Sequence, residues 1–308
     1  MINGNVSKIV VVAGPTASGK SNLALNLAQE FKGELICSDS MQVYRQMDIG
    51  TAKPTLKEQK LVQYHQLDLI DPDEHYSAGQ YERDTSRIIK QIQERSHLPI
   101  VVGGTGLYYR ALMYGISNIP EIPESLRKEV LSWQEEHGTS YCWKQLQKHD
   151  PQGADRLHQN DTARILRNLE VVLATGTTLS TFQLQQPFGE ARYQFLAVAL
   201  EWERHVLYER INQRTIKMLE FGWIAEVESL LSRYSPDLKP LQAIGYREIV
   251  QYLQNKLEWE SLLQEIQKRT RQYAKRQMTW FSREAEIEWY QPDNDAAILA
   301  KIKVYLEK

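Results

Sequence analysis

The chain has 308 residues, of which 42% are hydrophobic and 25% are charged. These values are those of an ordinary soluble globular protein, and the length predicts one large domain or two unequal ones. The net charge of −2 taken alone argues against a nucleic-acid binder. However, residues 268–283 carry six positive charges and no acidic residue, so the distribution of charge matters more than the total.

Neither cysteine chemistry nor a membrane is indicated. Cys37 and Cys142 lie far apart and form no CxxC pair, which argues against a disulfide framework or a zinc site and is typical of a reducing compartment. The N-terminal apolar run, Ile9–Ala13, is too short for a secretory signal. No stretch approaches the roughly 20 apolar residues that cross a bilayer. We therefore expect a cytoplasmic protein with no membrane contact.

Short apolar runs alternate with longer helix-like segments over about the first 115 residues. Buried strands are predicted at Lys8–Ala13, Glu34–Ser38, Tyr64–Ile70 and Pro99–Val102, and helices at about Lys20–Phe31, Ser77–Glu94 and near Thr105. This alternation predicts an α/β fold with a parallel sheet flanked by helices on both faces. Ligands of such sheets bind beyond the C-terminal ends of the strands.

The pattern changes from about residue 117 to residue 192, where the chain becomes polar and helical with few β-branched runs. We predict an all-helical insertion domain here. Phe195–Leu200 (FLAVAL) has the pattern of a buried strand that rejoins the sheet, and long amphipathic helices are expected at Arg204–Arg233 and Glu260–Arg283. The expected core domain is therefore 1–116 with 193–308, and the insertion is 117–192.

A glycine-rich segment directly follows the first strand and opens a helix. It reads GPTASGKS and matches the P-loop pattern GxxxxGK[ST] in full. Successive backbone N–H groups of such a loop point at a bound anion. A lysine adds charge on the bridging phosphates, and the serine hydroxyl suits Mg²⁺. The predicted fold is therefore P-loop NTPase-like and binds a diphosphate or a triphosphate, with Ser21 as the candidate metal ligand. The candidate phosphate-binding residues are Gly14, Pro15, Thr16, Ala17, Ser18, Gly19, Lys20 and Ser21.

Two further polar residues follow strands at the same rim of the sheet. Asp39 can ligate Mg²⁺ or accept a proton from an incoming nucleophile, or it can simply form an Asx turn. Thr105, in the run GGTG, can contact a leaving phosphate or position a substrate, or it can cap the following helix. No apolar run ends in a DE-type pair of hydrolases, which argues against a motor protein or a GTPase.

With these residues beside the loop, the sequence resembles the bacterial tRNA dimethylallyltransferases, also called tRNA isopentenyltransferases. The resemblance runs almost end to end, and the DIGTAKP run and the AKRQ-TW segment are its most specific parts. The chain carries no Cys/His zinc-finger extension of the eukaryotic relatives, so the bacterial form is the better match. The matching segments are GPTASGKS at 14–21, SDSMQVYRQMDIGTAKP at 38–54, VGGTGLYYRAL at 102–112, DTARILRNLEV at 161–171, QAIGYREI at 242–249 and TRQYAKRQMTWF at 270–281.

The resemblance implies transfer of a dimethylallyl group from dimethylallyl diphosphate to an adenosine N6. That adenosine lies immediately 3′ of the anticodon in tRNAs that read codons beginning with U. Diphosphate leaves, Mg²⁺ assists, and the target base is flipped out of the anticodon loop. The implied catalytic residues are Asp39 as the base, with Thr105 and Arg214 at the diphosphate. The implied partners are the tRNA anticodon stem-loop and the donor, and we expect a monomer.

The same resemblance implies RNA contacts on both predicted domains, with the insertion against the anticodon stem. The C-terminal basic helix is suited to clamp the RNA backbone and to stack bases on its aromatic residues, or alternatively to bury those aromatic residues in the core. The implied tRNA-binding residues are Asp39, Ser40, Met41, Gln42, Thr105, Arg127, Ala163, Arg164, Ile165, Leu166, Arg167, Gln242, Gly245, Tyr246, Arg247, Lys275, Arg276 and Gln277.

Two other functions remain open from the residues alone. A P-loop kinase for a small metabolite or nucleotide accounts equally well for the loop, the carboxylate and a helical lid, but not for the basic, aromatic C-terminal helix. A non-catalytic RNA-binding protein leaves the intact GKS sequence unexplained.

Overall fold

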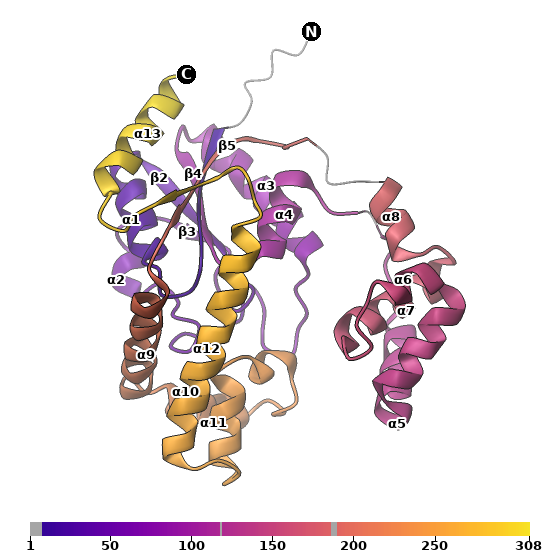
Figure 1. The fold of residues 1–308 in the computed structure, drawn as a ribbon. Helices are drawn as coiled ribbons and strands as arrows, with labels where there is room; N and C mark the ends of the chain where they lie inside the picture. The colour runs from indigo at the N-terminus through magenta and orange to yellow at the C-terminus, as the bar shows by residue number, and fades with distance from the viewer. Residues whose placement is uncertain (1–7, 118, 186–189) are drawn as a thin grey trace. The chain divides into compact units, whose positions relative to one another are not determined.

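The structure, a computed structural model, describes residues 8–117, 119–185 and 190–308. The chain divides into two compact units (Figure 1): unit 1 is Met1–Met113 with Ala191–Lys308, and unit 2 is Tyr114–Glu190. Residues 1–7 of the predicted core and residues 118 and 186–189 of the predicted insertion lie outside the described residues.

Unit 1 is built on a six-stranded sheet whose paired strands are all parallel, which confirms the predicted α/β fold. Its central strands β1, β4 and β5 are rich in Val, Ile, Leu and Ala because helices cover both faces. The strand order is β3-β2-β4-β1-β5-β6. The bounds are β1 Lys8–Ala13, β2 Gly33–Ser38, β3 Tyr64–His65, β4 Leu98–Gly103, β5 Gln194–Leu200 and β6 Ile287–Tyr290.

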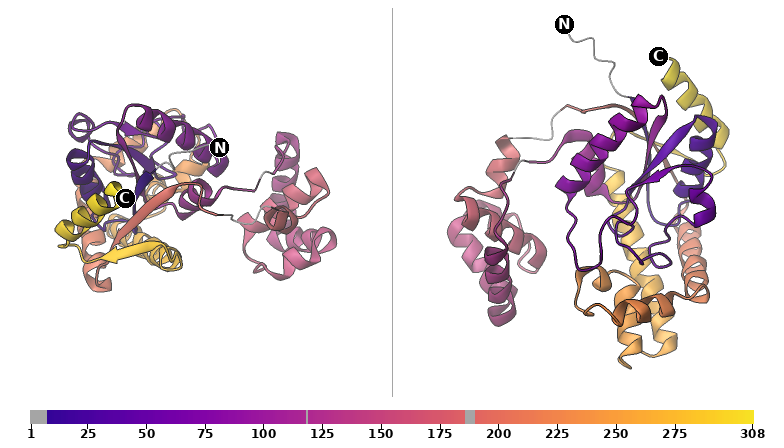
Figure 2. Two further views of the ribbon diagram at one scale, coloured as in Figure 1. Left: turned by 90° about the horizontal axis from the view of Figure 1, so that it is seen from above. Right: turned by 180° about the vertical axis from the view of Figure 1, so that it is seen from behind.

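The helices of this unit cover the sheet and extend beyond its C-terminal edge. The first and last of them, α1 and α13, lie side by side against one face (Figures 1 and 2), where their apolar residues share a core with β1, β2, β4 and β5. The bounds are α1 Lys20–Glu30, α2 Leu56–Gln59, α3 Ala78–Glu94, α4 Gly106–Tyr114, α9 Arg204–Glu220, α10 Trp223–Leu231, α11 Tyr246–Leu253, α12 Trp259–Phe281 and α13 Asp295–Glu307.

The third strand is much shorter than predicted. Only Tyr64 and His65 pair with β2, and the predicted strand Tyr64–Ile70 is wrong beyond them. Gln66 and Asp68 adopt left-handed backbone conformations, with φ of 64° and 52°. An extended strand cannot continue through such residues, and Ile70 forms an isolated bridge with Tyr44 instead.

The predicted helix Arg204–Arg233 is also wrong as a single element. It is broken after Glu220 into α9 and α10, because Gly222 at the N-cap of α10 has φ 96°. A left-handed glycine is a common way to end one helix and redirect the chain. β6 and α13, which were not expected from the sequence, follow the basic helix and complete the sheet and its cover.

The secondary structure in the described part of unit 2 consists of helices alone. Its small core joins α5, α6 and α7 through Val130, Cys142, Leu146, Ala154, Ile165 and Leu169. Gly138 interrupts α5 with φ 79°, so this segment is two helices joined at a kink. The bounds are α5 Glu124–His149, α6 Pro151–Asp155, α7 Thr162–Thr175 and α8 Leu179–Gln185.

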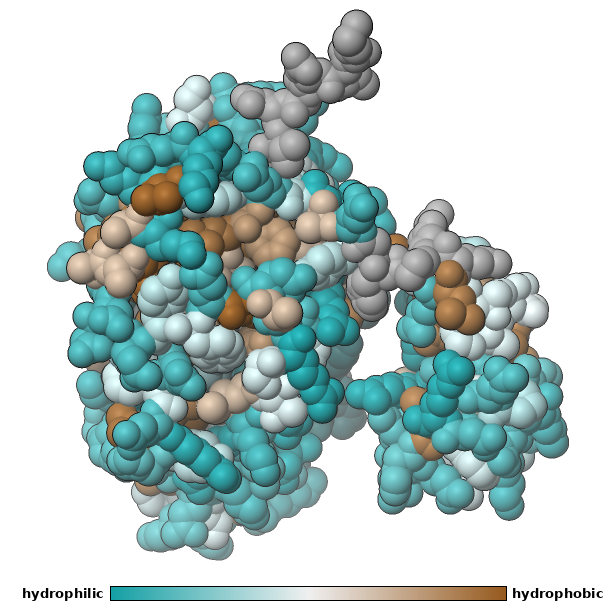
Figure 3. All heavy atoms as spheres, turned by 45° about the horizontal axis from the view of Figure 1, so that its top comes forward, coloured by the Kyte–Doolittle hydropathy of each residue, from teal (hydrophilic) through white to brown (hydrophobic). Residues whose placement is uncertain are grey.

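Hydrophilic side chains dominate the molecular surface shown in Figure 3, with a smaller area of hydrophobic residues on the larger unit. None of the helices in the described ranges is long and apolar enough to cross a membrane.

A buried carboxylate holds the N-terminal end of the sheet together. Glu34 in β2 is 4% exposed and accepts hydrogen bonds at 2.7 Å from His65 and His97 and at 2.8 and 3.0 Å from Arg95. Its burial opposes ionisation, but these bonds outweigh that effect and lower its pKa to about 2. The interaction ties β2 to β3 and to the loop before β4.

We predict that Glu34→Gln destabilises the protein by about 1.5–3 kcal/mol at pH 7, the range for hydrogen bonds to a charged group. A carboxylate whose folded pKa is depressed stabilises the fold above its unfolded pKa, and this contribution is lost as pH falls towards about 2. Urea unfolding should therefore show the two proteins converging below about pH 4.5. The exposed Glu220 gives the control, Glu220→Gln. A constant difference between pH 7 and pH 4 would contradict this account.

Candidate active site

One cavity of about 470 Å³ lies at the C-terminal ends of the strands, within unit 1. It is lined by the P-loop, by residues 39–42 after β2, by residues 50–54 and by side chains of α9 and α12. Segments from widely separated parts of the chain therefore meet where parallel sheets bind ligands.

Two side chains, those of Trp202 and Arg210, hold the P-loop backbone from outside. Ala17 and Gly19 have left-handed conformations, with φ of 63° and 99°. The Ala17 carbonyl accepts a hydrogen bond of 2.8 Å from Arg210, and the Ser18 carbonyl accepts one of 2.7 Å from Trp202. Arg210 also stacks 4.2 Å over the Trp202 ring. Because the C=O and N–H of a trans peptide point in opposite directions, the outward Ser18 carbonyl leaves the following Gly19 amide turned towards an anion site, whereas the Ser18 amide bonds to the Pro15 carbonyl at 3.4 Å.

Two cations meet at the mouth of this loop. Burial and, less strongly, the charge of Arg214 together lower the pKa of Lys20 to about 8, against the opposing effect of the Asp39 charge. Arg214 of α9 donates a hydrogen bond of 3.1 Å to the Thr16 hydroxyl, and burial lowers its pKa as well. Two desolvated positive charges side by side are costly unless an anion joins them. This pair suits a diphosphate.

Asp39 and Thr105 lie together at the same rim. The Asp39 carboxylate accepts a hydrogen bond of 2.8 Å from the Met41 amide, so the Asx turn weighed from the sequence is present. The Thr105 hydroxyl accepts one of 3.1 Å from the Ser40 amide. A carboxylate has four acceptor positions and a hydroxyl keeps its own hydrogen to donate. Both groups are thus oriented by the backbone and retain capacity for a substrate.

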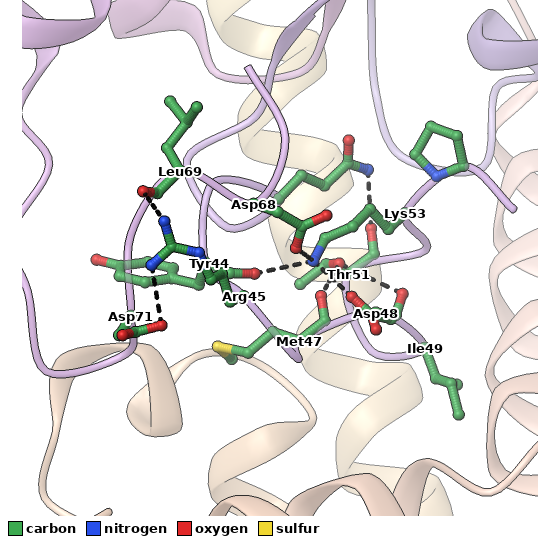
Figure 4. A network of polar contacts seen from close by, with 12 residues as sticks. Tyr44, Arg45, Met47, Asp48, Ile49, Thr51, Lys53, Asp68, Leu69 and Asp71 are labelled. Atoms are coloured by element: carbon green, nitrogen blue, oxygen red, sulfur yellow. Dashed lines mark hydrogen bonds and ion pairs between the residues drawn. The ribbon is translucent and has the colours of Figure 1, made fainter. Parts of the chain in front are cut away.

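The DIGTAKP segment forms a wall of the cavity through a polar network that sequence reasoning missed (Figure 4). The ammonium of Lys53 donates to the Tyr44 carbonyl at 2.8 Å, to Asp48 at 2.5 Å and to Asp68 at 2.6 Å. Its side chain is 4% exposed. Thr51 donates 2.5 Å to the Met47 carbonyl. The buried Lys53 and its two carboxylate partners thus fix the turn. The lysine of the DIGTAKP motif was the feature of the sequence from which this network could have been predicted.

Glu226 of α10 anchors the same segment from the other side. Its carboxylate accepts from the amides of residues 48, 49 and 50 at 2.9, 2.6 and 3.2 Å and from the Tyr246 hydroxyl at 2.7 Å. These partners lie far away in the sequence, so no local pattern could have revealed this role. The anchor joins α10, α11 and the cavity wall.

The basic helix α12 exposes some of its basic and aromatic residues and buries others. Lys275 and Arg276 are exposed, and Arg276 lies over the Tyr273 ring at the cavity. Phe281 is buried, and Trp280 packs edge-on against Tyr109 and Phe281. Of the aromatic residues considered for stacking on RNA, Tyr273 is therefore the one at the cavity, while the other two belong to the packing of the core.

The remaining candidate RNA contacts lie in two places in unit 1 and in unit 2. Ser40, Met41 and Gln42 line the cavity, where the Gln42 amide donates to the carbonyls of Thr51 and Ala52. The others in unit 1 lie at the end of the 3-10 helix η1 (Lys239–Gln242) and just after it. Gln242 is exposed and Tyr246 is buried, and both line the cavity; Gly245 is buried, and Arg247 pairs with the buried Glu248 at 3.0 Å.

In unit 2, three arginines have acidic neighbours on their own helices: Arg127 with Glu124 at 3.9 Å, Arg164 with Asp161 at 3.4 Å and Arg167 with Glu170 at 3.2 Å. Ala163 is exposed, Leu166 is half-buried, and Ile165 is fully buried in the core of the unit. The Ile165 side chain therefore has a packing role.

Comparison with known proteins assigns the chain to a family. A family described as IPP transferase matches residues 42–284. The chain belongs to this family. Among curated IPP transferase relatives, tRNA dimethylallyltransferase 2 of Geotalea uraniireducens is 44% identical over 293 residues, which are 94% of each chain. The tRNA dimethylallyltransferase of Thermotoga petrophila is 43% identical over 92% of each chain.

Solved structures agree with this assignment. The full-length tRNA isopentenylpyrophosphate transferase of Bacillus halodurans is 36% identical with a TM-score of 0.72, over 98% of this chain and 97% of that one. A eukaryotic dimethylallyltransferase acting on tRNA is 31% identical with a TM-score of 0.80, over 93% of this chain and 74% of that one. The IPP transferase membership confirms the resemblance inferred from the motifs.

Proposed function

We propose that this enzyme transfers the dimethylallyl group of dimethylallyl diphosphate to N6 of the adenosine immediately 3′ of the anticodon, in tRNAs that read codons beginning with U. The observation that carries this proposal is the cavity shared by Lys20, Arg214 and Asp39, with Thr105 bonded to Ser40 of its lining, in a chain whose relatives are named tRNA dimethylallyltransferases. The kinase alternative is not favoured, since the relatives reported above are prenyltransferases.

The cavity residues divide the chemistry between them. A bond forms from N6 to the first carbon of the dimethylallyl group as the bond from that carbon to the diphosphate oxygen breaks. Lys20, Arg214 and the P-loop amides stabilise the charge that develops on the leaving diphosphate. Asp39 accepts the proton that N6 loses. Thr105, held against Ser40, donates to the diphosphate and so places the leaving group opposite the amine.

The donor set at the loop suits Mg²⁺ held jointly by protein and substrate. Within the described ranges, no cluster of three or more His, Cys, Asp or Glu side chains could hold a metal alone. Mg²⁺ commonly binds one or two protein oxygens together with phosphate oxygens and waters. Here Ser21, exposed in the first turn of α1, supplies such an oxygen. When bound, the ion neutralises charge on the diphosphate.

The tRNA anticodon stem-loop is the proposed acceptor, bound with its target base flipped into the cavity. Helix α12 offers Lys275 and Arg276 to the RNA backbone, and the arginines of unit 2 are proposed contacts for the stem. We further propose that the enzyme acts as a monomer in the cytoplasm, where its tRNA substrate is found.

One assay tests the proposal. The protein is incubated with labelled dimethylallyl diphosphate, Mg²⁺ and an unmodified anticodon stem-loop, and transfer of label to the RNA is measured. A stem-loop in which guanosine replaces the target adenosine is the matched control. We expect label on the adenosine substrate alone. Absence of transfer, together with turnover of ATP with a small acceptor, would support the kinase instead.

We predict that the double substitution Lys275→Ala and Arg276→Ala weakens stem-loop binding and reduces its salt dependence. Each lost phosphate contact lowers the slope of log K against log salt by about one unit. Filter binding across a salt series measures the slope. The control replaces the exposed Lys303 and Lys308 near the C-terminus by alanine. A slope equal to that of the wild type would assign the two α12 charges to solvation of the helix.

A further inference from the structure

Gln277 of α12 is buried although it follows two exposed cations. Its side chain is 6% exposed and uses both halves of its amide. The oxygen accepts a hydrogen bond of 2.9 Å from the Thr16 amide in the P-loop. The nitrogen donates one of 2.9 Å to the Gly104 carbonyl in the turn before Thr105. One side chain thus joins two loops that follow two different strands, β1 and β4.

The contact is closely packed at Gly104. A Cβ at this position would lie 2.2 Å from the Gln277 nitrogen and 3.2 Å from the Gly14 carbonyl. Only a residue without a side chain lets the P-loop, the Gly104 turn and α12 approach to this extent. The amide of Gln277 therefore occupies a fitted position between the loops.

Each residue that bonds to Gln277 is itself bonded to, or adjacent in sequence to, a residue assigned to the reaction. The hydroxyl of Thr16 accepts the hydrogen bond from Arg214, which we assign to the diphosphate. Gly104 directly precedes Thr105, whose hydroxyl is bonded to Ser40 beside Asp39. A shift between the two loops would change the distance from the leaving group to the acceptor amine. Misplacement by about 1 Å can cost about 100-fold in rate.

We propose that Gln277 is a positioning residue, which sets the diphosphate loop and the Thr105 turn at the distance that the transfer requires, rather than an RNA contact. This inference rests on the function proposed above. The site demands a neutral amide, because one neighbour is a donor and the other an acceptor. A carboxylate would still accept from Thr16 but would face the Gly104 carbonyl without a hydrogen to donate.

The test compares Gln277→Glu, Gln277→Met and the matched control Gln267→Glu. Gln267 lies on the same helix and donates to the Asn212 carbonyl at 3.3 Å, away from both loops. At saturating substrates and pH 8, we expect kcat of the two Gln277 variants to fall about 10- to 100-fold. Stem-loop affinity should stay within about twofold of the wild type, and the control should match the wild type.

The pH profile separates positioning from a merely structural role. A protonated glutamic acid has one hydrogen to donate and so replaces the amide. Burial favours that form. The ratio of kcat for Gln277→Glu to the wild type should therefore rise as pH falls from 8 to 6, whereas the ratio for Gln277→Met should stay constant. Equal, flat ratios for both variants would overturn the proposal.

Binding of inorganic diphosphate to the enzyme, measured by calorimetry, gives a readout that does not depend on transfer. We expect Gln277→Met to bind it about 10-fold more weakly, because the Thr16 amide loses its anchor. Wild-type affinity for diphosphate with weakened stem-loop binding would make Gln277 an RNA contact and overturn the inference. A wild-type enzyme that binds diphosphate but transfers no label would instead refute the proposed function alone.

Discussion

Asp39→Asn is expected to lower turnover by at least about 100-fold, the usual contribution of a general base. Asparagine has the same shape and keeps the oxygen that accepts from the Met41 amide, so the turn after β2 should persist. It cannot take the proton from N6. Single-turnover transfer from labelled donor to the stem-loop, with both at saturation, measures the chemical step.

The affinity of Asp39→Asn for the stem-loop should be compared with its single-turnover rate. Stem-loop affinity should remain largely intact because the substitution removes a proton acceptor and not an RNA clamp. Asp237→Asn, at an exposed position, controls for the loss of one negative charge. If the single-turnover rate of Asp39→Asn equals that of the wild type, Asp39 is not the base.

Lys20→Met is expected to lower kcat/KM for the donor by about 100- to 1,000-fold, the usual cost of removing one group that stabilises charge in the transition state. Methionine has a similar length and tolerates burial, but it removes the hydrogen bond of 3.1 Å that the ammonium donates to the Pro15 carbonyl within the loop. Arg210, which holds the loop from outside, offers a comparison: Arg210→Lys keeps the charge and should cost far less. Equal losses in both variants would attribute the effect to loop disorder.

The pH dependence of donor binding follows from the same lysine. Its pKa of about 8 in the free enzyme means that the ammonium is present below that pH and lost above it. A diphosphate attracts the ammonium and raises its pKa, so donor affinity should be constant below about pH 8 and fall above it. Inorganic diphosphate ionises in the same range, so its titrations between pH 6.5 and 9.5 are compared with Lys20→Met: the affinity of the wild type relative to the variant should fall above about pH 8.

Local sequence patterns were enough to predict much of the fold and the phosphate-binding part of the site. The apolar runs of β1, β2, β4 and β5 predict buried parallel strands because each is short and bounded by polar or glycine residues. The P-loop carries its function in eight consecutive residues, since the anion is bound mainly by its own backbone. Asp39 and Thr105 follow adjacent strands of a parallel sheet, so their shared rim could be predicted before any coordinates.

Tertiary structure alone decided which polar residues support the site. Glu226 binds the amides of residues 48–50, and Gln277 bridges Thr16 and Gly104, across separations of about 170 to 260 residues. Such hydrogen bonds leave no periodic trace, because each partner is an ordinary residue in its own segment. The early end of β3 had the same cause: left-handed conformations at Gln66 and Asp68 depend on the contacts around them. The amino-acid sequence by itself therefore determined the chemistry of this protein, and the packing of distant segments determined how that chemistry is held in place.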